Sequence, residues 1–307
     1  MFDQRTYGIF TSCFLLAALS GCDRSNSTAP ETAQTPSRIE VYTVNYPLKY
    51  FADRIAGDLV DVVFPVPSDQ DPAYWKPNPD IVASFQQADL ILLNGAAYAK
   101  WTEQVSLPWS RLLNTSQGLE DRHIEIEGAA RHSHGPAGRH AHSGVAFTTW
   151  LDPTLAERQA QAIRDGLARL LPHHKDLLDL NFDALKRDLN DLDQQLSKAT
   201  ESVRVQPLLA SHPVYQYLAR RYDLNLKSVH WEPHEIPDEE RWAELDELLA
   251  NHAATRMIWE APPDAAIVNT LHRRGIRCMV FHPCGNTPRA GDYMTVMRDN
   301  ARRLNEG

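Results

Sequence analysis

One long apolar stripe constrains the fold of this chain more than any other feature. Between Lys175 and Thr200, large apolar side chains recur at steps of 4, 3, 4, 3 and 4 residues, with polar residues between them. They are Leu178, Phe182, Leu185, Leu189, Leu192 and Leu196. At about 1.5 Å per residue this is one continuous helical stripe roughly 28 Å long. It predicts a long amphipathic helix that packs against this chain or, alternatively, pairs with a partner helix in a coiled coil.

Strand-like and helical runs alternate on both sides of that helix, as in α/β domains. The predicted strands are Ile39–Val44, Val60–Pro65, Ala88–Asn94, Pro207–Ala210, Leu226–His230, Arg256–Trp259 and Cys278–Phe281. The predicted helices are Leu48–Ala56, Ile81–Gln87, Pro153–Leu171, Val214–Arg221, Arg241–Leu249, Ala265–Arg274 and Tyr293–Leu304. The fold class is therefore α/β, with two lobes, each a mainly parallel sheet flanked by helices, joined by a long rigid linker helix.

The N-terminal segment has the pattern of an export signal. Arg5 precedes an apolar run from Ile9 to Leu19 that is too short for a membrane span of roughly 20 residues. The run ends in Leu19-Ser20-Gly21-Cys22, which resembles the lipobox of bacterial lipoproteins. We expect 1–21 to be a signal peptide and Cys22 to carry the lipid. An ordinary signal peptide with an incidental cysteine is the alternative.

The rest of the chain divides into a tether and three structural parts. Residues 22–37 are polar and predict a flexible tether. Asp23 after the cysteine resembles the signal that retains lipoproteins at the inner membrane, facing the periplasm. We expect an N-terminal lobe at 38–172, which includes the His-rich loop 131–143 and the helix 153–171. The linker helix at 173–202 and the C-terminal lobe at 203–307 follow.

The net charge and the motifs that the sequence lacks argue against two function classes. The net charge of −9 argues against a nucleic-acid partner. We also expect the protein to be a monomer. No nucleophile elbow, pair of catalytic carboxylates or phosphate-binding loop is evident, so we do not expect an enzyme.

Cys278 and Cys284 bracket a strand-like run that would hold their Cα atoms beyond the roughly 4.4–6.8 Å of a disulfide. We expect them to stay unpaired, although a sharp turn at Pro283 would permit a bridge.

Several segments, taken together, carry a family resemblance. They are Tyr46-Pro47-Leu48, Ala88-Asp89-Leu90-Ile91 with Asn94-Gly95, Trp150-Leu151-Asp152-Pro153, Ser211-His212 before Tyr215–Tyr222, and Gly291-Asp292 before the last helix. From Ile39 to Leu304 the chain resembles the solute-binding lipoproteins of zinc and manganese ABC transporters. The resemblance implies two α/β lobes joined by a long helix, one metal ion between them, and delivery of that ion to a membrane permease.

Two of that family's four usual metal-ligand positions differ in this chain. By resemblance, Ala73 stands at the first histidine position and Thr148 at the second. The third ligand is present as His212, and His282 matches a position that is usually an aspartate. The usual site therefore cannot form from these residues.

Other residues of the second lobe can complete a metal site. Zinc takes about four nitrogen, oxygen or sulfur ligands, and His212 and His282 both follow predicted strands, where open α/β sheets build sites. Imidazole suits zinc whereas manganese prefers more carboxylate, so we expect Zn²⁺, with Mn²⁺ as the second choice. A structural role is the alternative for each histidine.

The segment from His230 to Glu235 follows another strand of the same lobe. In an extended chain alternate residues share a face, so His230, Glu232 and His234 can point the same way. Glu232 or His234 then supplies a third ligand. The alternative is that these side chains line the rim of the cleft and bind water.

Four further residues are candidates for the cleft itself. Glu260 ends a predicted strand and is a weaker ligand candidate. Tyr74, Trp75 and Trp231 are expected to wall the cleft and exclude water, although core packing explains a tryptophan equally well.

A His-rich loop provides an auxiliary metal-binding candidate. Arg131 to Ser143 contains His132, His134, His140 and His142 among glycine and proline, a composition that cannot pack a core. Such histidine pairs can capture a metal ion weakly and pass it inward. Two alternatives remain: a solvated loop without a role, and a loop whose His140 or His142 replaces a missing ligand.

Four functions are consistent with these patterns. The first is a solute-binding lipoprotein that captures Zn²⁺ for an ABC permease in the inner membrane. The second is a binding protein for a metal chelate or another small solute. The third is a metal hydrolase that uses His212, His282 and Glu232. The fourth is a metal-buffering or adhesive surface lipoprotein.

Overall fold

The structure is a computed structural model that describes residues 38–126, 131–133, 139–141 and 144–306. Residues from Arg38 onward form one compact unit. The predicted signal peptide, Cys22 and the tether lie outside the described residues, and so do His134 and His142. Only the backbone is described for His132 and His140.

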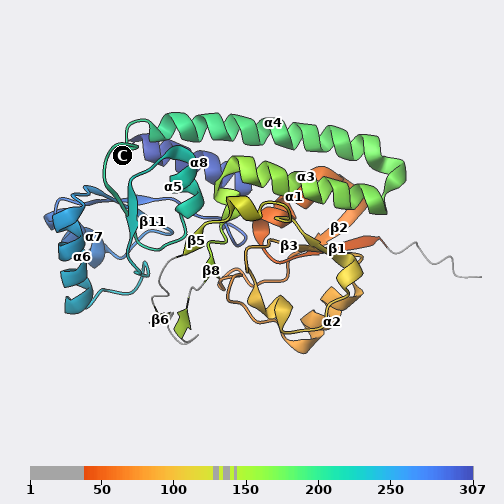
Figure 1. The fold of residues 1–307 in the computed structure, drawn as a ribbon, viewed down its shortest axis with the longest axis horizontal. Coiled ribbons are helices and arrows are strands. Elements are labelled where there is room, and N and C mark those ends of the chain that lie inside the picture. The colour runs from red at the N-terminus through yellow and green to blue at the C-terminus, as the bar shows by residue number, and fades with distance from the viewer. Residues whose placement is uncertain (1–37, 127–130, 134–138, 142–143, 307) are drawn as a thin grey trace, which may run out of the picture. The chain divides into compact units, whose positions relative to one another are not determined.

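Each lobe contains a four-stranded parallel sheet (Figure 1). The first sheet consists of β1 (Ile39–Thr43), β2 (Val60–Val63), β3 (Leu90–Leu93) and β4 (Leu112–Asn114), in the order β2-β1-β3-β4. The second consists of β9 (Leu208–Ala210), β10 (Leu226–Ser228), β11 (Arg256–Trp259) and β12 (Arg277–Val280), in the order β10-β9-β11-β12. The predicted α/β class and parallel sheets are confirmed. Strand β4 was not predicted, because three residues between polar neighbours give no periodic signal.

Helices flank both sheets. They are α1 (Tyr46–Ala56), α2 (Pro79–Gln87), α3 (Pro153–Leu170), α4 (Lys175–Thr200), α5 (Gln216–Tyr222), α6 (Glu239–Asn251), α7 (Ala265–Arg273) and α8 (Tyr293–Glu306). Two short antiparallel pairs join β5 (Glu125–Ile126) to β8 (Gly144–Val145), and β6 (Arg131–Ser133) to β7 (Arg139–Ala141).

Side-chain caps fix where several of these helices begin. Asn45 accepts a hydrogen bond from Leu48 N at 3.1 Å ahead of α1, and Asp152 accepts one from Thr154 N at 2.9 Å ahead of α3. Asp238 caps α6 in the same way, through Arg241 N. Each carboxylate or amide oxygen satisfies a backbone N–H that has no partner within its helix, which stabilises the first turn.

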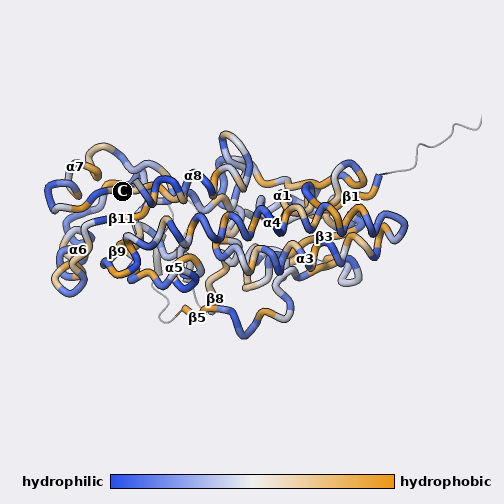
Figure 2. Tube along the Cα trace, turned by 90° about the horizontal axis from the view of Figure 1, so that it is seen from above, coloured by the Kyte–Doolittle hydropathy of each residue, from blue (hydrophilic) through white to orange (hydrophobic). Residues whose placement is uncertain are grey.

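The apolar stripe of α4 is buried within this chain. All six of its predicted residues are buried, and α4 packs against α1, α3 and α8. Figure 1 shows α3 and α4 side by side, and Figure 2 shows hydrophobic and hydrophilic positions alternating along the turns of α4. The described residues thus occupy the face that a coiled-coil partner would need.

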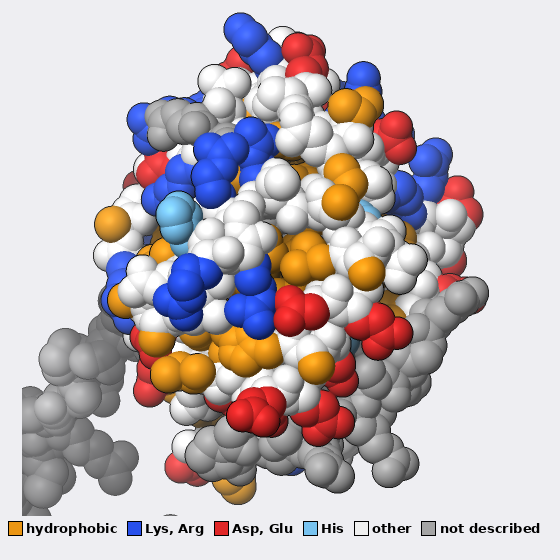
Figure 3. Space-filling model, turned by 90° about the vertical axis from the view of Figure 1, so that its left-hand side faces the viewer, with side chains coloured by type: hydrophobic (Ala, Val, Ile, Leu, Met, Phe, Trp, Pro, Cys, Tyr) orange, Lys and Arg blue, Asp and Glu red, His pale blue; other side chains and the backbone are white. Residues whose placement is uncertain are grey.

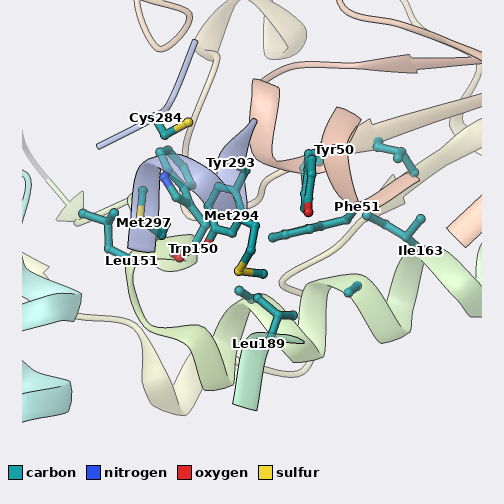
Figure 4. Packing of buried hydrophobic residues seen from close by; sticks show 14 of the residues in the cluster. Tyr50, Phe51, Trp150, Leu151, Ile163, Leu189, Cys284, Tyr293, Met294 and Met297 are labelled. Carbon is teal, nitrogen blue, oxygen red and sulfur yellow. Dashed lines mark hydrogen bonds between the residues drawn. The ribbon is translucent and has the colours of Figure 1, made fainter. Parts of the chain in front are cut away.

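One hydrophobic core continues from the first lobe into the second. It contains Val41 and Ile91 of the first sheet as well as Leu208 and Ile258 of the second. Where α1 meets α8, the ring of Tyr293 lies 5.5 Å from that of Tyr50 and 5.2 Å from that of Phe51. The Tyr293 hydroxyl donates to Trp150 O at 2.7 Å (Figure 4). The two lobes are therefore joined by packed aromatic rings as well as by α4.

The surface and the thiols complete the description. Figure 3 shows acidic and basic side chains interspersed with hydrophobic ones at the end of the molecule that carries α6 and α7. Within the described residues, no helix combines the length and apolarity needed to cross a membrane. Cys278 is half-buried, Cys284 is buried, and both thiols are free.

Candidate metal centre

Four candidate side chains follow the parallel strands of the second sheet. His212, Glu232, Glu260 and His282 come after β9, β10, β11 and β12, respectively. Strands β9 and β11 are neighbours at the centre of the sheet although they are not consecutive in the chain. Ligands of open α/β sheets bind at such a crossover, outside the carboxyl ends of the strands. His212 and Glu260 occupy that position.

His212 is the centre of a charged cluster. Its Nδ1 lies 3.1 Å from Glu260 Oε1 and 3.8 Å from Glu232 Oε1. The ring of His230 stands at 76° to the His212 ring, with 5.8 Å between the centroids. His212 itself is 8% exposed, so these interactions act in a medium of low polarity, where charges interact strongly. One buried imidazole therefore meets two carboxylates whose side chains are partly exposed, at 38% for Glu232 and 30% for Glu260.

The pKa of His212 is raised above its ordinary value. Burial alone lowers this pKa, because it penalises the imidazolium. The hydrogen bond and the charge of Glu260, together with the charges of Glu232 and Asp71, outweigh burial. A cation that binds to this imidazole must therefore displace a proton that the carboxylates stabilise.

The contact with Glu260 also selects a tautomer. A proton on Nδ1 of the neutral ring donates to Glu260 and leaves the lone pair on Nε2. A carboxylate that holds a histidine in this way orients the ring and raises its basicity as a metal ligand. Glu260 can thus serve His212 as an orienting partner or bind a cation directly.

Asp71 and Tyr74 of the first lobe interact electrostatically with this cluster. The negative charge of Asp71 contributes to the raised pKa of His212. The pKa of Tyr74 is raised by burial first, and then by the charges of Asp71, Glu260 and Glu232. Acidic groups from both lobes therefore act on the pKa of His212. Asp71 was not among the ligands predicted from the sequence, because its neighbours Pro72 and Ala73 offer no chemical signal.

The residues at the two altered ligand positions are both buried. Ala73 is 7% exposed and can offer no ligand atom from its side chain. The hydroxyl of Thr148 donates to Val214 O of the second lobe at 2.5 Å. Phe147 beside it is fixed through its carbonyl, which accepts a hydrogen bond from Asn94 Nδ2 at 2.9 Å. Thr148 thus acts as a connection between the lobes.

His282 has a different environment from His212. Its Nδ1 accepts a hydrogen bond from Cys284 N at 2.9 Å, which places the proton of the neutral ring on Nε2. Its backbone N–H and C=O both bond to the Asn300 side chain, at 3.0 and 2.8 Å. Burial lowers the pKa of His282, opposed by Glu260 and assisted by Arg303. These contacts favour the alternative that His282 has a structural role. A metal ion would have to displace either the hydrogen bond at Nδ1 or the proton on Nε2.

The segment after β10 is extended over only part of its predicted length. His230 and Glu232 both lie beside His212. A turn then follows, in which Glu235 N donates to Glu232 O at 3.2 Å. The side chain of His234 is 77% exposed, with its Nδ1 3.4 Å from Asp264 Oδ1. The prediction that His234 shares a face with His230 and Glu232 is therefore wrong, because the turn breaks the two-residue alternation.

The three aromatic residues expected at the cleft have different positions. Trp75 is buried, with its ring 6.1 Å from that of Trp101. Trp231 packs in the second lobe, with its ring 4.8 Å from that of Trp242. Both tryptophans are core residues, as the alternative interpretation had it. Tyr74 alone has a described interaction with the acidic cluster.

The His-rich loop is described only in part. Its backbone forms the antiparallel pair β6–β7, in which His132 is the register partner of His140. The auxiliary metal role of these histidines stays a prediction. Within the described residues, no group of three or more His, Cys, Asp or Glu side chains is arranged to hold a metal ion.

Comparison with known proteins identifies the family. The family model described as "Zinc-uptake complex component A periplasmic" (ZnuA) matches residues 41–307. The chain belongs to this family. The resemblance inferred from its sequence is thereby confirmed.

Relatives within and beyond the family are distant in sequence. The zinc-binding lipoprotein AdcA of Streptococcus pneumoniae is 24% identical over 291 residues, which cover 89% of this chain and 56% of AdcA. The chain thus spans little more than half of that relative. The high-affinity zinc uptake system protein ZnuA of Bacillus subtilis is 25% identical over 270 residues, or 86% of this chain and 82% of that protein. The crystal structure of the metal-dependent lipoprotein YcdH from Bacillus subtilis superposes with a TM-score of 0.74 at 22% identity. It covers 87% of this chain and 98% of YcdH, which shows a shared fold.

Proposed function

We propose that this protein captures a divalent metal ion, Zn²⁺ first and Mn²⁺ second, and delivers it to the permease of an ABC transporter. The observation that carries the proposal is the His212 cluster, in which a buried imidazole lies 3.1 Å from Glu260 and 3.8 Å from Glu232. The negative charge of Asp71 in the other lobe also acts on His212. Membership of the zinc-uptake family and the names of its relatives support the same cargo.

The donor set fits a borderline-to-hard divalent cation. One imidazole nitrogen with two or three carboxylates satisfies zinc, which accepts histidine and acidic ligands in a tetrahedral arrangement. More oxygen ligands move the preference toward manganese. Because Ala73 and Thr148 offer no histidine, we propose His212, Glu232, Glu260 and Asp71 as the principal ligands. His282 and His234 are secondary candidates.

Export and membrane attachment are part of the same proposal. We propose that the protein is exported, that Cys22 carries a lipid anchor, and that 22–37 tether the body to the inner membrane on its periplasmic side. The lipobox-like Leu19-Ser20-Gly21-Cys22 and the naming of AdcA as a lipoprotein support this. A monomeric carrier held near its permease raises the local concentration of captured ions there.

One observation favours a second candidate cargo. Since the described residues offer no preformed group of three ligands, the cation can arrive with ligands of its own, as a chelate. The protein would then supply His212 and one carboxylate while the chelator completes the coordination sphere. We place this after the free ion because the acidic cluster is highly charged and compact.

The proposal is tested by titrating residues 38–307 with Zn²⁺ and Mn²⁺ by calorimetry. Binding should be near micromolar or tighter, and His212→Ala should weaken it at least tenfold. Deletion of 131–143 should leave it within threefold. His173→Ala, at an exposed position after α3, is the matched control. If the loop deletion abolishes binding and His212→Ala does not, the proposed centre is wrong.

A further inference from the structure

We propose that Asn286 is a positioning residue for the candidate metal centre. Its amide holds the first-lobe segment 67–75, which carries Asp71 and Tyr74, against the second lobe. The inference rests on the proposed function and adds to it a residue that sets how fast the cation leaves.

The side chain of Asn286 spans the two lobes. It lies in the loop between β12 and α8, and its Nδ2 donates to both Pro67 O and Gln70 O, each at 2.7 Å. These two carbonyls begin and end a turn that is closed by Gln70 N donating to Pro67 O at 3.1 Å. All four residues of this turn are exposed. One amide group thus uses both of its N–H donors to fasten an exposed turn.

That turn is continuous with the acidic side of the centre. Asp71 follows it directly, and its Oδ1 accepts from Ala73 N at 2.9 Å. The carbonyl of Asp71 accepts from Tyr74 N at 3.1 Å and from Trp75 N at 2.9 Å. Three backbone bonds to one residue make 71–75 a locally rigid piece. We therefore expect a displacement of the turn to move Asp71 and Tyr74 together.

Two other hydrogen bonds of the same loop connect it to residues outside segment 67–75. Tyr46 N donates to Gly285 O at 3.0 Å, and Trp150 Nε1 donates to Pro283 O at 2.8 Å. Figure 4 shows Trp150 and Cys284 within the packed cluster between the lobes. These contacts persist when only the Asn286 amide is changed. The effect of a substitution at Asn286 is therefore expected at 67–75 and at the cation site.

The test compares Asn286→Asp with Asn181→Asp. Both substitutions are nearly isosteric and replace an amide that donates to a backbone carbonyl by a carboxylate that cannot. Asn181 Nδ2 donates to Ile55 O at 3.0 Å, joining α4 to α1. This control adds the same charge and removes the same type of bond. Asn286→Ala is included because it removes the donors without adding charge.

Two measurements are made on the full-length protein. The first is the rate of Zn²⁺ release into excess chelator, which should rise about tenfold in both Asn286 variants and stay within twofold in Asn181→Asp. The second is hydrogen exchange of the Tyr74 and Trp75 amides without metal, which should accelerate in the Asn286 variants only.

The outcomes separate this inference from the proposed function. If the parent protein binds neither Zn²⁺ nor Mn²⁺, the proposed function fails, and the exchange of the Tyr74 and Trp75 amides alone decides the role of Asn286. If the parent binds the ion but both release and exchange are unchanged in Asn286→Asp, the role of Asn286 is refuted while the cargo stands. Equal acceleration of exchange in Asn181→Asp also refutes it.

Discussion

Glu260 Oε1 lies 3.1 Å from His212 Nδ1, which joins the residue directly after β11 to a buried histidine that follows β9. The two residues are far apart in the chain, yet they are adjacent because β9 and β11 are neighbouring parallel strands. Burial lowers the pKa of His212, and the interaction with Glu260 supplies most of the increase that offsets this effect.

Substitution of Glu260 tests that relationship directly. Glu260→Gln keeps the shape and an acceptor oxygen but removes the negative charge, so the pKa of His212 should fall. The measurement is an NMR titration of the His212 ring in metal-free protein. Glu232→Gln should have a smaller effect, because its oxygen is 3.8 Å away. A larger effect from Glu232→Gln would reverse the roles assigned to the two carboxylates.

Cation affinity should depend on pH in a specific range. Because the pKa of His212 is raised, protons compete for this ring at pH values above the ordinary histidine value of about 6.5. Zn²⁺ affinity should therefore begin to decline above that pH and continue to fall on acidification. Competition titrations from pH 8 to pH 5.5 measure this, and a flat profile would remove His212 from the ligand set. In metal-free protein the same shift contributes stability below the unfolded pKa, which is lost as pH rises through the folded pKa.

His282 should produce the opposite effect on stability. Its folded pKa is lowered, so the unfolded chain binds a proton more readily, and stability falls as pH drops from about 6.5 toward the folded pKa. His282→Asn has no titrating group and should lose less stability between pH 7.5 and pH 5.5. Urea unfolding of metal-free protein at both pH values gives the comparison. Identical losses in parent and variant would show that His282 does not control acid sensitivity.

The stripe of α4 should contribute strongly to stability. Leu189 is 1% exposed within the core shared by both lobes, and its truncation to alanine should cost about 3 kcal/mol. Leu180 on the same helix is 62% exposed, and its truncation should change stability by less than about 0.5 kcal/mol. Urea unfolding of the two variants measures the contrast. Equal effects would mean that α4 does not depend on its stripe.

Local periodicity in the sequence was sufficient for most of the fold. The steps of four and three in α4 and the apolar runs of the central strands are both short-range patterns. Strand β4 was not predicted, because a pattern of three residues is too short to indicate a strand. The turn at Glu232–Glu235 was not predicted either, so His234 was wrongly placed on the same face as His230 and Glu232.

The sequence by itself determined the α/β class, the long helix, the order of the lobes and His212 as a candidate ligand. Each depends on repeating side-chain types or on a residue directly after a strand. Tertiary structure decided which groups surround His212: Glu260 through strand adjacency, and Asp71 and Tyr74 through contact between the lobes. It also decided that Nδ1 of His282 accepts a backbone hydrogen bond. Electrostatic and hydrogen-bond partners depend on distances across the folded chain, which no local pattern of residues encodes.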